Sequence, residues 1–565
     1  MTRGAPEVDK YVVSGLRGGG GQEATTDVLI VGAGPVGLTL AIALSRLSVR
    51  VRVVDQAPET KRQPRAAVLW PRALEILRDL GIVADFEEAA NELHSVDIYG
   101  DGRRLGGLDV GRVPSAHPYP LVVEQHDIER ILCANLARLG VRVEWRTEAT
   151  GVRLFEDRAE VTLKRADGSE ETAAGSWVVG CEGTRSVVRD SVAIPFEGGR
   201  RENLQVLQAN AVPTWGYADS PTHGYFFLAP RIALGVFPIP GGGYRFFAFT
   251  EDPDPSRKGP PTLDEMRELV AAAAHAPGLD LELTEPTWIT RARFSDRIAT
   301  TLRRGRALLA GDAAHAWAPV GGHGMNAGIR GAHNLAWKLA AVHRGEAGEG
   351  LLDTYSEEQR ATARAVIREM RFNVLELPLP PLGLLAIRTL MPLGLSSEAV
   401  KRRVEFALSD LGMHHRGSPL SSHRTTSGRL RAGDRLPDVG VFADEEKTTL
   451  HRLLSIEHWT LLLTGRGEAD SQRRAREVVG SFEAPIRVAQ VAPSDANAER
   501  ELKRKGLMVL VRPDGYVGLV APIAGTSTLD RYLEEFLARA SRRPSTASSM
   551  LRAIAGAEGS GRGVQ

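Results

Sequence analysis

The sequence predicts an α/β protein. A Rossmann-like nucleotide-binding domain is interleaved with an antiparallel-sheet domain and followed by a smaller α/β domain. A strand, a glycine-rich turn and a helix occupy 27–47, and three aromatic, β-rich runs broken by turns occupy 224–250. Strand and helix patterns resume after a polar stretch at 411–428. At 565 residues the chain is too long for one hydrophobic core, so two or three domains are expected.

The first βαβ unit carries the pattern Gly-x-Gly-x-x-Gly. Asp27–Val31 is a short apolar run, as in a buried parallel strand, and Gly32-Ala-Gly-Pro-Val-Gly37 follows it directly. Gly34 lets the backbone approach a pyrophosphate, and Gly37 lets the helix pack closely on the strand. The next strand ends in Asp55, near the position roughly 20 residues on where an acid binds a ribose. The unit therefore predicts a bound dinucleotide.

A second motif indicates which dinucleotide. The apolar strand Ala307–Ala310 leads into Gly311-Asp312, and Pro319 precedes the glycine-rich start of a helix at 320–326. A helix N-terminus with free N–H groups favours negative charge. Together the two motifs suggest a flavin held at its phosphate end and at its ring end.

Composition excludes several function classes. A net charge of +1 gives no electrostatic reason to expect a nucleic-acid or membrane partner. The two cysteines, Cys133 and Cys181, exclude a disulfide framework and a four-cysteine zinc site, and no metal is expected. This cysteine usage fits a reduced, cytoplasmic setting. No apolar run approaches the roughly 18 residues of a membrane span.

Apolar patterns indicate the other elements. Residues 376–395, with prolines among leucines and methionines, predict a stiff apolar crossing. Residues 411–428 are typical of a linker, and a small α/β unit follows from 433 to about 540. Period-two alternation predicts a hairpin over 152–173. Helical periodicity is found at 72–80, 126–139, 327–342 and 352–376.

Three segments, in this order, resemble the fingerprints of single-component FAD-dependent aromatic hydroxylases: the glycine motif, Val179–Arg189 and Gly311–Asn326. These class A flavoprotein monooxygenases include relatives of 4-hydroxybenzoate hydroxylase and the aromatic-polyketide hydroxylases. The resemblance covers 26 to about 410. Arg431–Asp438 and Leu510–Tyr516 resemble the thioredoxin-like extension of the phenol and polyketide branches. Because that extension has no Cys-x-x-Cys here, a packing or dimer role is expected for it.

The resemblance implies a GR2-type FAD-binding domain. The expected boundaries are a disordered lead at 1–24, the FAD-binding domain at 25–93, 119–204 and 286–410, the substrate-binding domain at 94–118 and 205–285, a linker at 411–430, the thioredoxin-like domain at 431–540 and a disordered tail at 541–565.

The same resemblance implies roles for individual residues. Asp55 would bind the adenosine ribose, Arg65 the ribityl–phosphate region, and Asp312 the ribityl hydroxyls. The amides of Met325 and Asn326 would face the flavin C2 carbonyl, where reduced flavin carries negative charge. The full expected cofactor-binding set is Gly32, Gly34, Pro35, Val36, Gly37, Asp55, Gln56, Arg65, Ala66, Gln125, Glu182, Asp312, Pro319, Gly324, Met325 and Asn326.

Three positions depart from the family pattern. Glu182 stands where the family usually has Asp, which touches the flavin phosphate and helps present the nicotinamide cofactor, so the reach of this carboxylate is longer. His323 replaces the usual Gln; it either titrates between pH 5 and 8 near the ring or fills the loop and points away. Gly331 replaces a frequent Asp.

The activity implied by the resemblance is oxygen insertion. NADPH or NADH binds transiently and reduces FAD, O2 adds at the flavin C4a, and the distal oxygen of this hydroperoxide is transferred to an electron-rich ring. The run 224–240 is aromatic and aliphatic, which favours a large, apolar, polycyclic aromatic substrate over a small benzoate. The expected pocket residues are Phe226, Phe227, Phe237 and Pro319, and the candidates for a base are His223, Tyr225 and His323.

Other readings of the same fold stay open. They are epoxidation, Baeyer–Villiger oxidation, halogenation or reduction by a flavoenzyme, and a non-catalytic FAD-binding protein. The Trp-x-Trp-x-Ile-Pro run of flavin-dependent halogenases is missing from the sequence. A monomer or a homodimer is expected.

Overall fold

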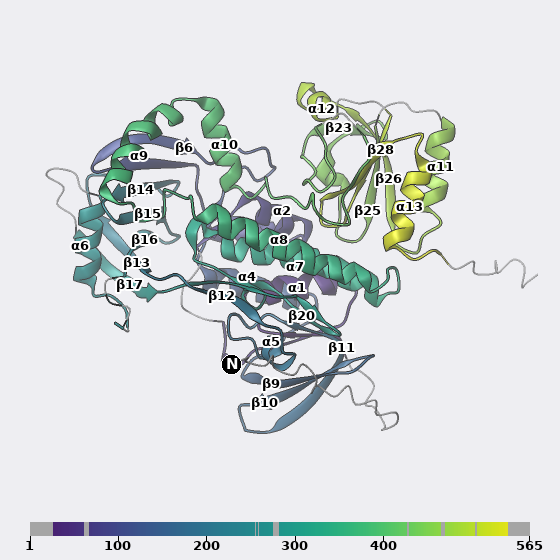
Figure 1. The fold of residues 1–565 in the computed structure, drawn as a ribbon, viewed down its shortest axis with the longest axis horizontal. Coiled ribbons are helices and arrows are strands. Elements are labelled where there is room, and N and C mark those ends of the chain that lie inside the picture. Colours follow the sequence, from purple (N-terminus) through teal and green to yellow (C-terminus); the bar gives the residue numbers. More distant parts are fainter. Residues whose placement is uncertain are drawn as a thin grey trace, which may run out of the picture.

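The computed structural model describes residues 26–60, 67–252, 254, 256–257, 259–274, 282–425, 429–464, 469–502 and 506–540. The segments 1–24 and 541–565, expected to be disordered, lie outside these residues, as do Arg65 and Ala66 of the predicted cofactor site. Figure 1 shows a nucleotide-binding domain with long helices, against which a sheet domain and a C-terminal α/β domain are packed.

A mostly parallel sheet forms the centre of the first domain, in the order β19-β20-β11-β1-β2-β8. All of β1 (Thr26–Val31) is buried, which explains its continuous apolar run. β11 (Glu170–Gly180) lies beside β1, and β20 (Ala307–Leu309) lies beyond β11, all parallel. The glycine motif after β1 and the Gly-Asp turn after β20 therefore lie at the same edge of the sheet, where ligands bind in such folds.

Helices enclose this sheet. α1 (Pro35–Arg46) contacts both α4 and α7, which accounts for its apolar surface on nearly every side. The other elements of this domain are β2 (Val51–Val54), β3 (Val68–Leu69), α2 (Pro71–Asp79), α3 (Val83–Ala89), β4 (Asn91–Glu92), β7 (Leu121–Val122), α4 (Gln125–Arg138), β8 (Val143–Glu144), β9 (Thr147–Leu154), β10 (Ala159–Arg165), α5 (Val187–Ser191), β12 (Phe196–Arg200), β18 (Ser295–Ala299), β19 (Arg303–Arg304), the short 3-10 helix η1 (Gly311–Ala313), β21 (His315–Ala316), the 3-10 turn η2 (Val320–Gly322), α7 (His323–His343) and α8 (Gly350–Met370).

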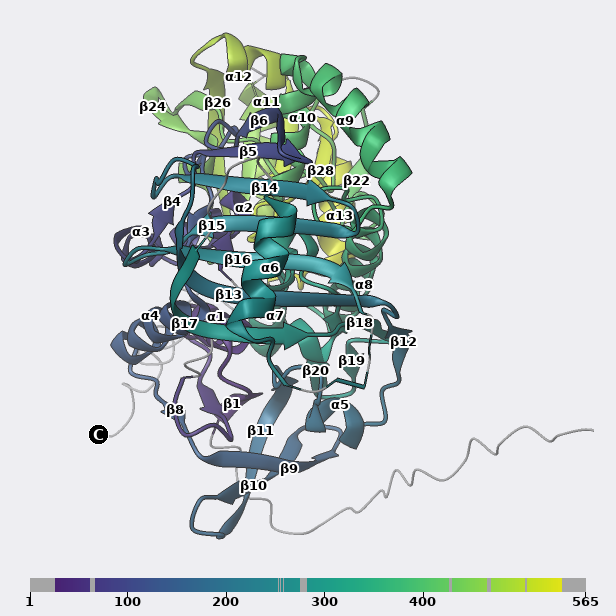
Figure 2. The same cartoon turned by 90° about the vertical axis from the view of Figure 1, so that its left-hand side faces the viewer.

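The second domain is a seven-stranded sheet in the order β17-β13-β16-β15-β14-β5-β6, with α6 crossing one face (Figure 2). Its last strand continues to Ala292, past the expected domain end at 285. Along β14, Phe226 and Leu228 face the nucleotide-binding domain, and Tyr225 and Phe227 face α6. The elements are β5 (Ser95–Gly100), β6 (Arg103–Asp109), β13 (Leu204–Thr214), β14 (His223–Ala229), β15 (Ile232–Pro238), β16 (Tyr244–Glu251), α6 (Leu263–Ala273) and β17 (Glu282–Ala292).

Two helices, α9 (Pro381–Leu395) and α10 (Glu398–Leu408), follow α8. The stiff crossing predicted at 376–395 is thus largely a helix. Pro381 lies in the first turn of α9, where the missing N–H of proline costs no hydrogen bond. α9 packs on β5 and β6 of the sheet domain. Among the described residues, no helix is both long and apolar enough to cross a membrane.

The C-terminal domain is a mixed sheet in the order β22-β28-β27-β25-β26-β23-β24. Part of the predicted linker at 411–430 belongs to it, because β22 pairs with β28. The elements are β22 (Ser422–His423), β23 (Gly440–Ala443), β24 (Glu446–Thr449), η3 (Leu450–Leu453), β25 (Trp459–Thr464), α11 (Ala469–Val479), β26 (Ile486–Pro493), α12 (Ala496–Glu501), β27 (Leu507–Val511), β28 (Val517–Pro522) and α13 (Thr526–Phe536).

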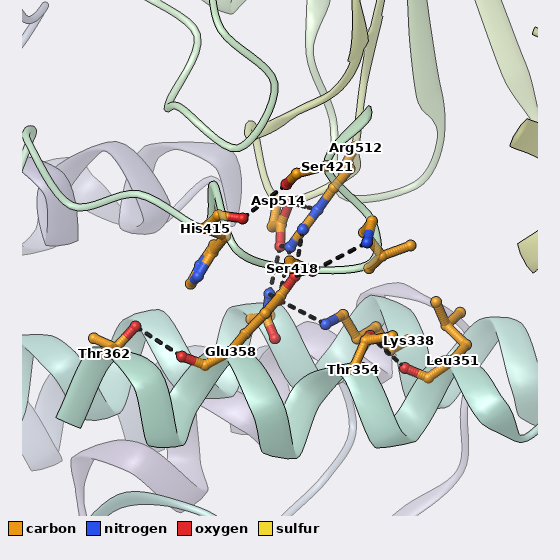
Figure 3. Close-up of polar contacts among 12 residues, drawn as sticks. Lys338, Leu351, Thr354, Glu358, Thr362, His415, Ser418, Ser421, Arg512 and Asp514 are labelled. Atoms are coloured by element: carbon orange, nitrogen blue, oxygen red, sulfur yellow. Dashed lines mark hydrogen bonds and ion pairs between the residues drawn. The ribbon is translucent and has the colours of Figure 1, made fainter. Parts of the chain in front are cut away.

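A buried network of ion pairs joins this domain to α7 and α8 (Figure 3). Glu358 of α8 accepts hydrogen bonds from Arg512 at 2.6 Å and from Lys338 of α7 at 2.7 Å. Asp514, in the turn between β27 and β28, accepts one from Asn334 at 2.7 Å. The network therefore ties the C-terminal domain to the long helices of the nucleotide-binding domain.

Candidate functional site

The glycine turn after β1 has the shape of a dinucleotide cradle. Gly32 has a φ of +105°, and a Cβ there would lie 2.6 Å from the Cys181 carbonyl carbon. A Cβ on Gly37 would lie 2.0 Å from the Gly32 oxygen, whereas a Cβ on Gly34 would meet nothing within 4 Å. Gly32 and Gly37 thus serve close backbone packing, and Gly34 faces open space. This arrangement fits a backbone that approaches a pyrophosphate.

Asp55 ties the cradle to β2. Its Oδ2 accepts the Ala33 N–H at 2.7 Å, and its Oδ1 accepts the Ala57 N–H at 2.8 Å. The carboxylate is only half-buried, so it remains open on the side where a ribose would lie. Gln56 beside it is exposed, and Gln125 begins α4, where its Nε2 donates to Glu129 at 2.8 Å.

Glu182 lies directly beyond the end of β11. Its Oε1 accepts the Val188 N–H of α5 at 2.8 Å. Its Oε2 is buried without a hydrogen-bond partner among the described residues, and burial raises the pKa of this carboxyl. The longer side chain therefore turns back onto its own loop.

The Gly-Asp turn after β20 carries the second half of the cradle. Asp312 is exposed, whereas Gly311 before it and the run 313–318 after it are buried. A Cβ on Gly328 of α7 would lie 2.4 Å from Val36 Cγ2 of α1, so α7 and α1 are in close contact. This contact fixes the distance between the two halves of the cradle.

The start of α7 is braced by Asn326. Its Oδ1 accepts the Trp70 N–H at 2.8 Å, and its Nδ2 donates to Val68 and Gly322 oxygens at 2.9 Å. The side chain of Asn326 thus holds the start of α7 in place, and the backbone N–H of Met325 is among those of the first turn that have no acceptor within the helix. The brace to Trp70 joins residues far apart in the sequence, and no motif indicated it.

An apolar cavity of about 530 Å³ lies beside this helix start. It is enclosed by β5, β6 and the helices α8, α9 and α10, and Val320 and His323 of the glycine turn reach it. Phe226 and Phe237 belong to the same hydrophobic cluster as Val320. The remaining lining is mostly apolar, with Glu369 and Asn373 as its polar members, and includes Ile98, Leu108, Val366, Met370, Phe372, Leu375, Ile387, Met391, Leu395, Val404, Leu408 and Met413.

Three predicted pocket or base residues lie elsewhere. Phe227 is fully buried against α6, on the opposite face of the sheet from Phe226. Tyr225 shares that face, its hydroxyl donates to the Ala218 oxygen at 2.6 Å, and burial raises its pKa. His223, two residues before Tyr225, contacts Ser95 at 2.7 Å, and burial lowers its pKa. Because side chains alternate along a strand, the predicted pocket residue Phe227 and the candidate bases His223 and Tyr225 share the face that is turned away from the cavity. Phe226, Phe237 and Pro319 do not line this cavity either.

His323 lies in a buried charged cluster. Its Nδ1 is 2.9 Å from Asp410 Oδ1, and Arg330 Nη1 is 2.9 Å from Asp410 Oδ2. Burial lowers the pKa of His323, but Asp410 and Glu376 together raise it by more, so the pKa lies above its usual value. Glu376 accepts the Gly321 N–H, and burial raises the pKa of Glu376 to about 7. His323 therefore does more than fill the loop, because it lines the apolar cavity and lies beside Asp410.

Comparison with known proteins identifies this cradle. A model of the FAD binding domain matches residues 25–370, and a model of the C-terminal domain of aromatic-ring hydroxylases matches residues 430–540. The chain belongs to the FAD-dependent aromatic-ring hydroxylases. The family predicted from the three motifs is thereby confirmed.

The similarity of this hydroxylase to its relatives extends over nearly the whole length of the chain. It is 33% identical to 6-methylpretetramide 4-monooxygenase of Streptomyces rimosus, over 90% of this chain and 93% of the relative. It is 28% identical to pentachlorophenol 4-monooxygenase of Sphingobium chlorophenolicum, over 92% and 98%. Its fold is similar to that of an aklavinone-11 hydroxylase solved with FAD and aklavinone, with a TM-score of 0.73, 27% identity, and coverage of 91% and 99%.

These findings confirm two predictions. The hydroxylase is a flavin-dependent monooxygenase, and its cofactor is FAD. Its relatives act on aromatic small molecules. The observed α/β fold, with an FAD-binding domain and a C-terminal domain, agrees with that family. The halogenase, reductase and non-catalytic readings are not favoured.

Proposed function

We propose that this hydroxylase uses NADPH or NADH and O2 to insert one oxygen atom into a large, mostly apolar, polycyclic phenol. The apolar cavity beside the start of α7 carries this proposal. At about 530 Å³ it falls within the size range of drug-sized ligand sites, and its lining is predominantly aliphatic. Such a lining favours fused rings over a small charged benzoate.

The relatives support an apolar aromatic substrate. Aklavinone occupies a similar structure, and the names of two relatives specify oxidation of 6-methylpretetramide and of a chlorinated phenol. In this chain two exposed apolar side chains also line the cavity, beside the exposed Glu369. Phe372 and Leu390 line the cavity and are 77% and 63% exposed. An apolar substrate would cover these side chains.

We assign the cofactor contacts as follows. Gly34 and the first turn of α1 face the pyrophosphate, Asp55 the ribose, and Asp312 the ribityl chain, and the Met325 and Asn326 amides face the ring. FAD, when bound, accepts hydride from the nicotinamide cofactor and activates oxygen. The protein holds the ring with a helix N-terminus, which stabilises negative charge, and keeps water away with an apolar pocket. The described members of this set are Gly32, Gly34, Pro35, Val36, Gly37, Asp55, Gln56, Gln125, Glu182, Asp312, Pro319, Gly324, Met325 and Asn326.

A cavity-filling variant tests the pocket. Met391 of α9 lines the cavity, whereas Leu382 of the same helix is 81% exposed and does not. Met391→Trp should abolish substrate-stimulated NADPH oxidation with polycyclic phenols, and Leu382→Trp should not. The products are identified by mass spectrometry under labelled oxygen, and light scattering distinguishes a monomer from a homodimer. Faster turnover with benzoates than with polycyclic phenols would contradict the substrate assignment.

A further inference from the structure

A second cavity, of about 570 Å³, opens between α8 and the small sheet formed by β12, β18 and β21. Its lining differs sharply from that of the apolar cavity. Five arginines reach it, Arg200, Arg201, Arg360, Arg364 and Arg371, together with the acids Glu197 and Asp296. We call it the arginine groove.

The arginine groove carries more positive than negative charge, because its arginines outnumber the acidic residues that line it. Arg201 pairs with Asp296 at 2.8 Å, and Arg200 lies 3.9 Å from Asp252. Asp252 is shared with Arg293, at 2.6 Å. Within the described part of the chain, neither Arg364 nor Arg371 forms an ion pair.

Two of the arginines repel each other on one face of α8. Arg360 and Arg364 are four residues apart on this helix, and Arg371 follows its last residue, Met370, as the C-cap. Like charges at such spacings destabilise a helix unless an anion compensates them.

Two buried guanidinium nitrogens have no acceptor. Arg360 Nε and Arg201 Nη2 are buried without a hydrogen-bond partner among the described residues. Burial, and then the neighbouring Arg364, lower the pKa of Arg360. An unsatisfied buried donor costs free energy, and an anion in the groove would satisfy both.

The groove lies next to the cofactor cradle without being part of it. Its wall β18 pairs with β21, with Ile298 opposite His315, and β21 begins three residues after Asp312. None of the proposed FAD contacts lines the groove. The groove and the Gly-Asp turn of the cradle are therefore connected through one pair of strands.

We propose that the arginine groove binds the phosphate-bearing half of the nicotinamide nucleotide that reduces the flavin. This inference rests on the proposed function, which requires such a reductant. Guanidinium groups bind phosphates in bidentate geometry, and a cluster of them suits several phosphate charges. The glycine motif is already assigned to FAD, and the sequence has no second one for the reductant.

The test uses FAD-loaded enzyme and 2′,5′-ADP, which carries the phosphates of NADPH without its nicotinamide. The double variant Arg364→Gln/Arg371→Gln should bind 2′,5′-ADP at least about tenfold more weakly by calorimetry, because two charged phosphate contacts are lost. Arg368→Gln is the matched control, since Arg368 is exposed on α8 and does not line the groove. The KM for NADPH should rise in the double variant, with kcat and FAD content unchanged.

Equal binding of 2′,5′-ADP by the double variant and the control would overturn the proposal. Inorganic phosphate that competes as well as 2′,5′-ADP would also overturn it, because the site would then not select a nucleotide. If 5′-ADP binds as tightly as 2′,5′-ADP and weakens equally in the variant, the proposal stands with NADH as the reductant. If neither NADPH nor NADH reduces the flavin in the wild-type enzyme, the proposed function itself is refuted, whatever binds in the groove.

Discussion

Arg512 of the C-terminal domain donates a 2.6 Å hydrogen bond to Glu358 of α8, and both side chains are at most 1% exposed. Lys338 approaches the same carboxylate at 2.7 Å, and Asp514 forms a further ion pair with Arg512. Glu358 therefore balances two buried cations from two domains. Taking away one member of such a network leaves the others charged and without solvent.

Glu358→Gln should destabilise the enzyme by about 3–5 kcal/mol, because the two cations lose the anion between them. Urea unfolding measures this loss. The exposed pair Arg416–Asp434, at 2.6 Å, is the control. Arg416→Ala should cost less than about 1 kcal/mol, since water replaces an exposed partner. Similar losses in both variants would show that the network contributes no more than a surface ion pair.

The two glycines of the cradle should respond differently to alanine. A Cβ on Gly34 meets nothing within 4 Å, so Gly34→Ala should keep its stability and lose FAD affinity. A Cβ on Gly37 would lie 2.0 Å from a backbone oxygen, so Gly37→Ala should lower the melting temperature even without FAD. Thermal unfolding of both apo variants, with FAD titration, separates the two effects. Tight FAD binding by Gly34→Ala would remove the pyrophosphate assignment.

Asp312 should be needed for cofactor retention and not for folding. It is exposed within a buried run, so Asp312→Ala leaves the hydrophobic core unchanged. The folded variant should purify without flavin absorbance and take up added FAD at least about tenfold more weakly, as expected for lost hydrogen bonds to a ligand. Asp157 is exposed in a loop and is distant in sequence from Asp312, so the control variant Asp157→Ala should retain its FAD and its yellow colour. Full FAD retention with normal turnover in Asp312→Ala would contradict its role.

The sequence predicted the cradle because its chemistry is local. The residues of each turn, Gly32 to Gly37 and Gly311–Asp312, are close together in the sequence. The apolar runs on either side of each turn predict the strand and the helix that flank it. What folding brings together from afar was not predictable in this way. Nothing near His323 indicates that Asp410 lies 2.9 Å away, and nothing near Asn326 indicates Trp70.

The pocket residues show a second limit of the sequence. The alternation of side chains along β14 predicts that Phe226 and Phe227 lie on opposite faces of the sheet. It does not predict which face packs against the FAD-binding domain. That choice is made by α6 on one side and by Val320 on the other. The prolines near 380 predicted a stiff crossing and not a helix. Pro381 instead lies at the first position of α9, where a proline is tolerated.

Glu376 should make stability depend on pH near neutrality. Burial raises the pKa of this carboxyl to about 7, against 4.5 for an ordinary glutamate, so the folded state binds more protons than the unfolded state between these values. The contribution of Glu376 to stability is therefore fully present below about pH 4.5 and is lost as the pH rises through 7. Glu376→Gln cannot ionise and can still accept the Gly321 N–H. Relative to this variant, the wild type should lose at most roughly 3 kcal/mol between these two pH values.

Urea unfolding of the two proteins at pH 5.0, 6.0, 7.0 and 8.0 measures that difference directly. The comparison cancels the contributions that do not depend on Glu376, and it retains the electrostatic coupling between Glu376 and His323. Glu357→Gln, on the exposed side of α8, controls for the loss of a carboxylate and should track the wild type at every pH. Parallel stability curves for Glu376→Gln and the wild type would mean that Glu376 is charged at all these pH values. The Gly321 N–H would then hold a carboxylate rather than a neutral acid beside the cofactor turn.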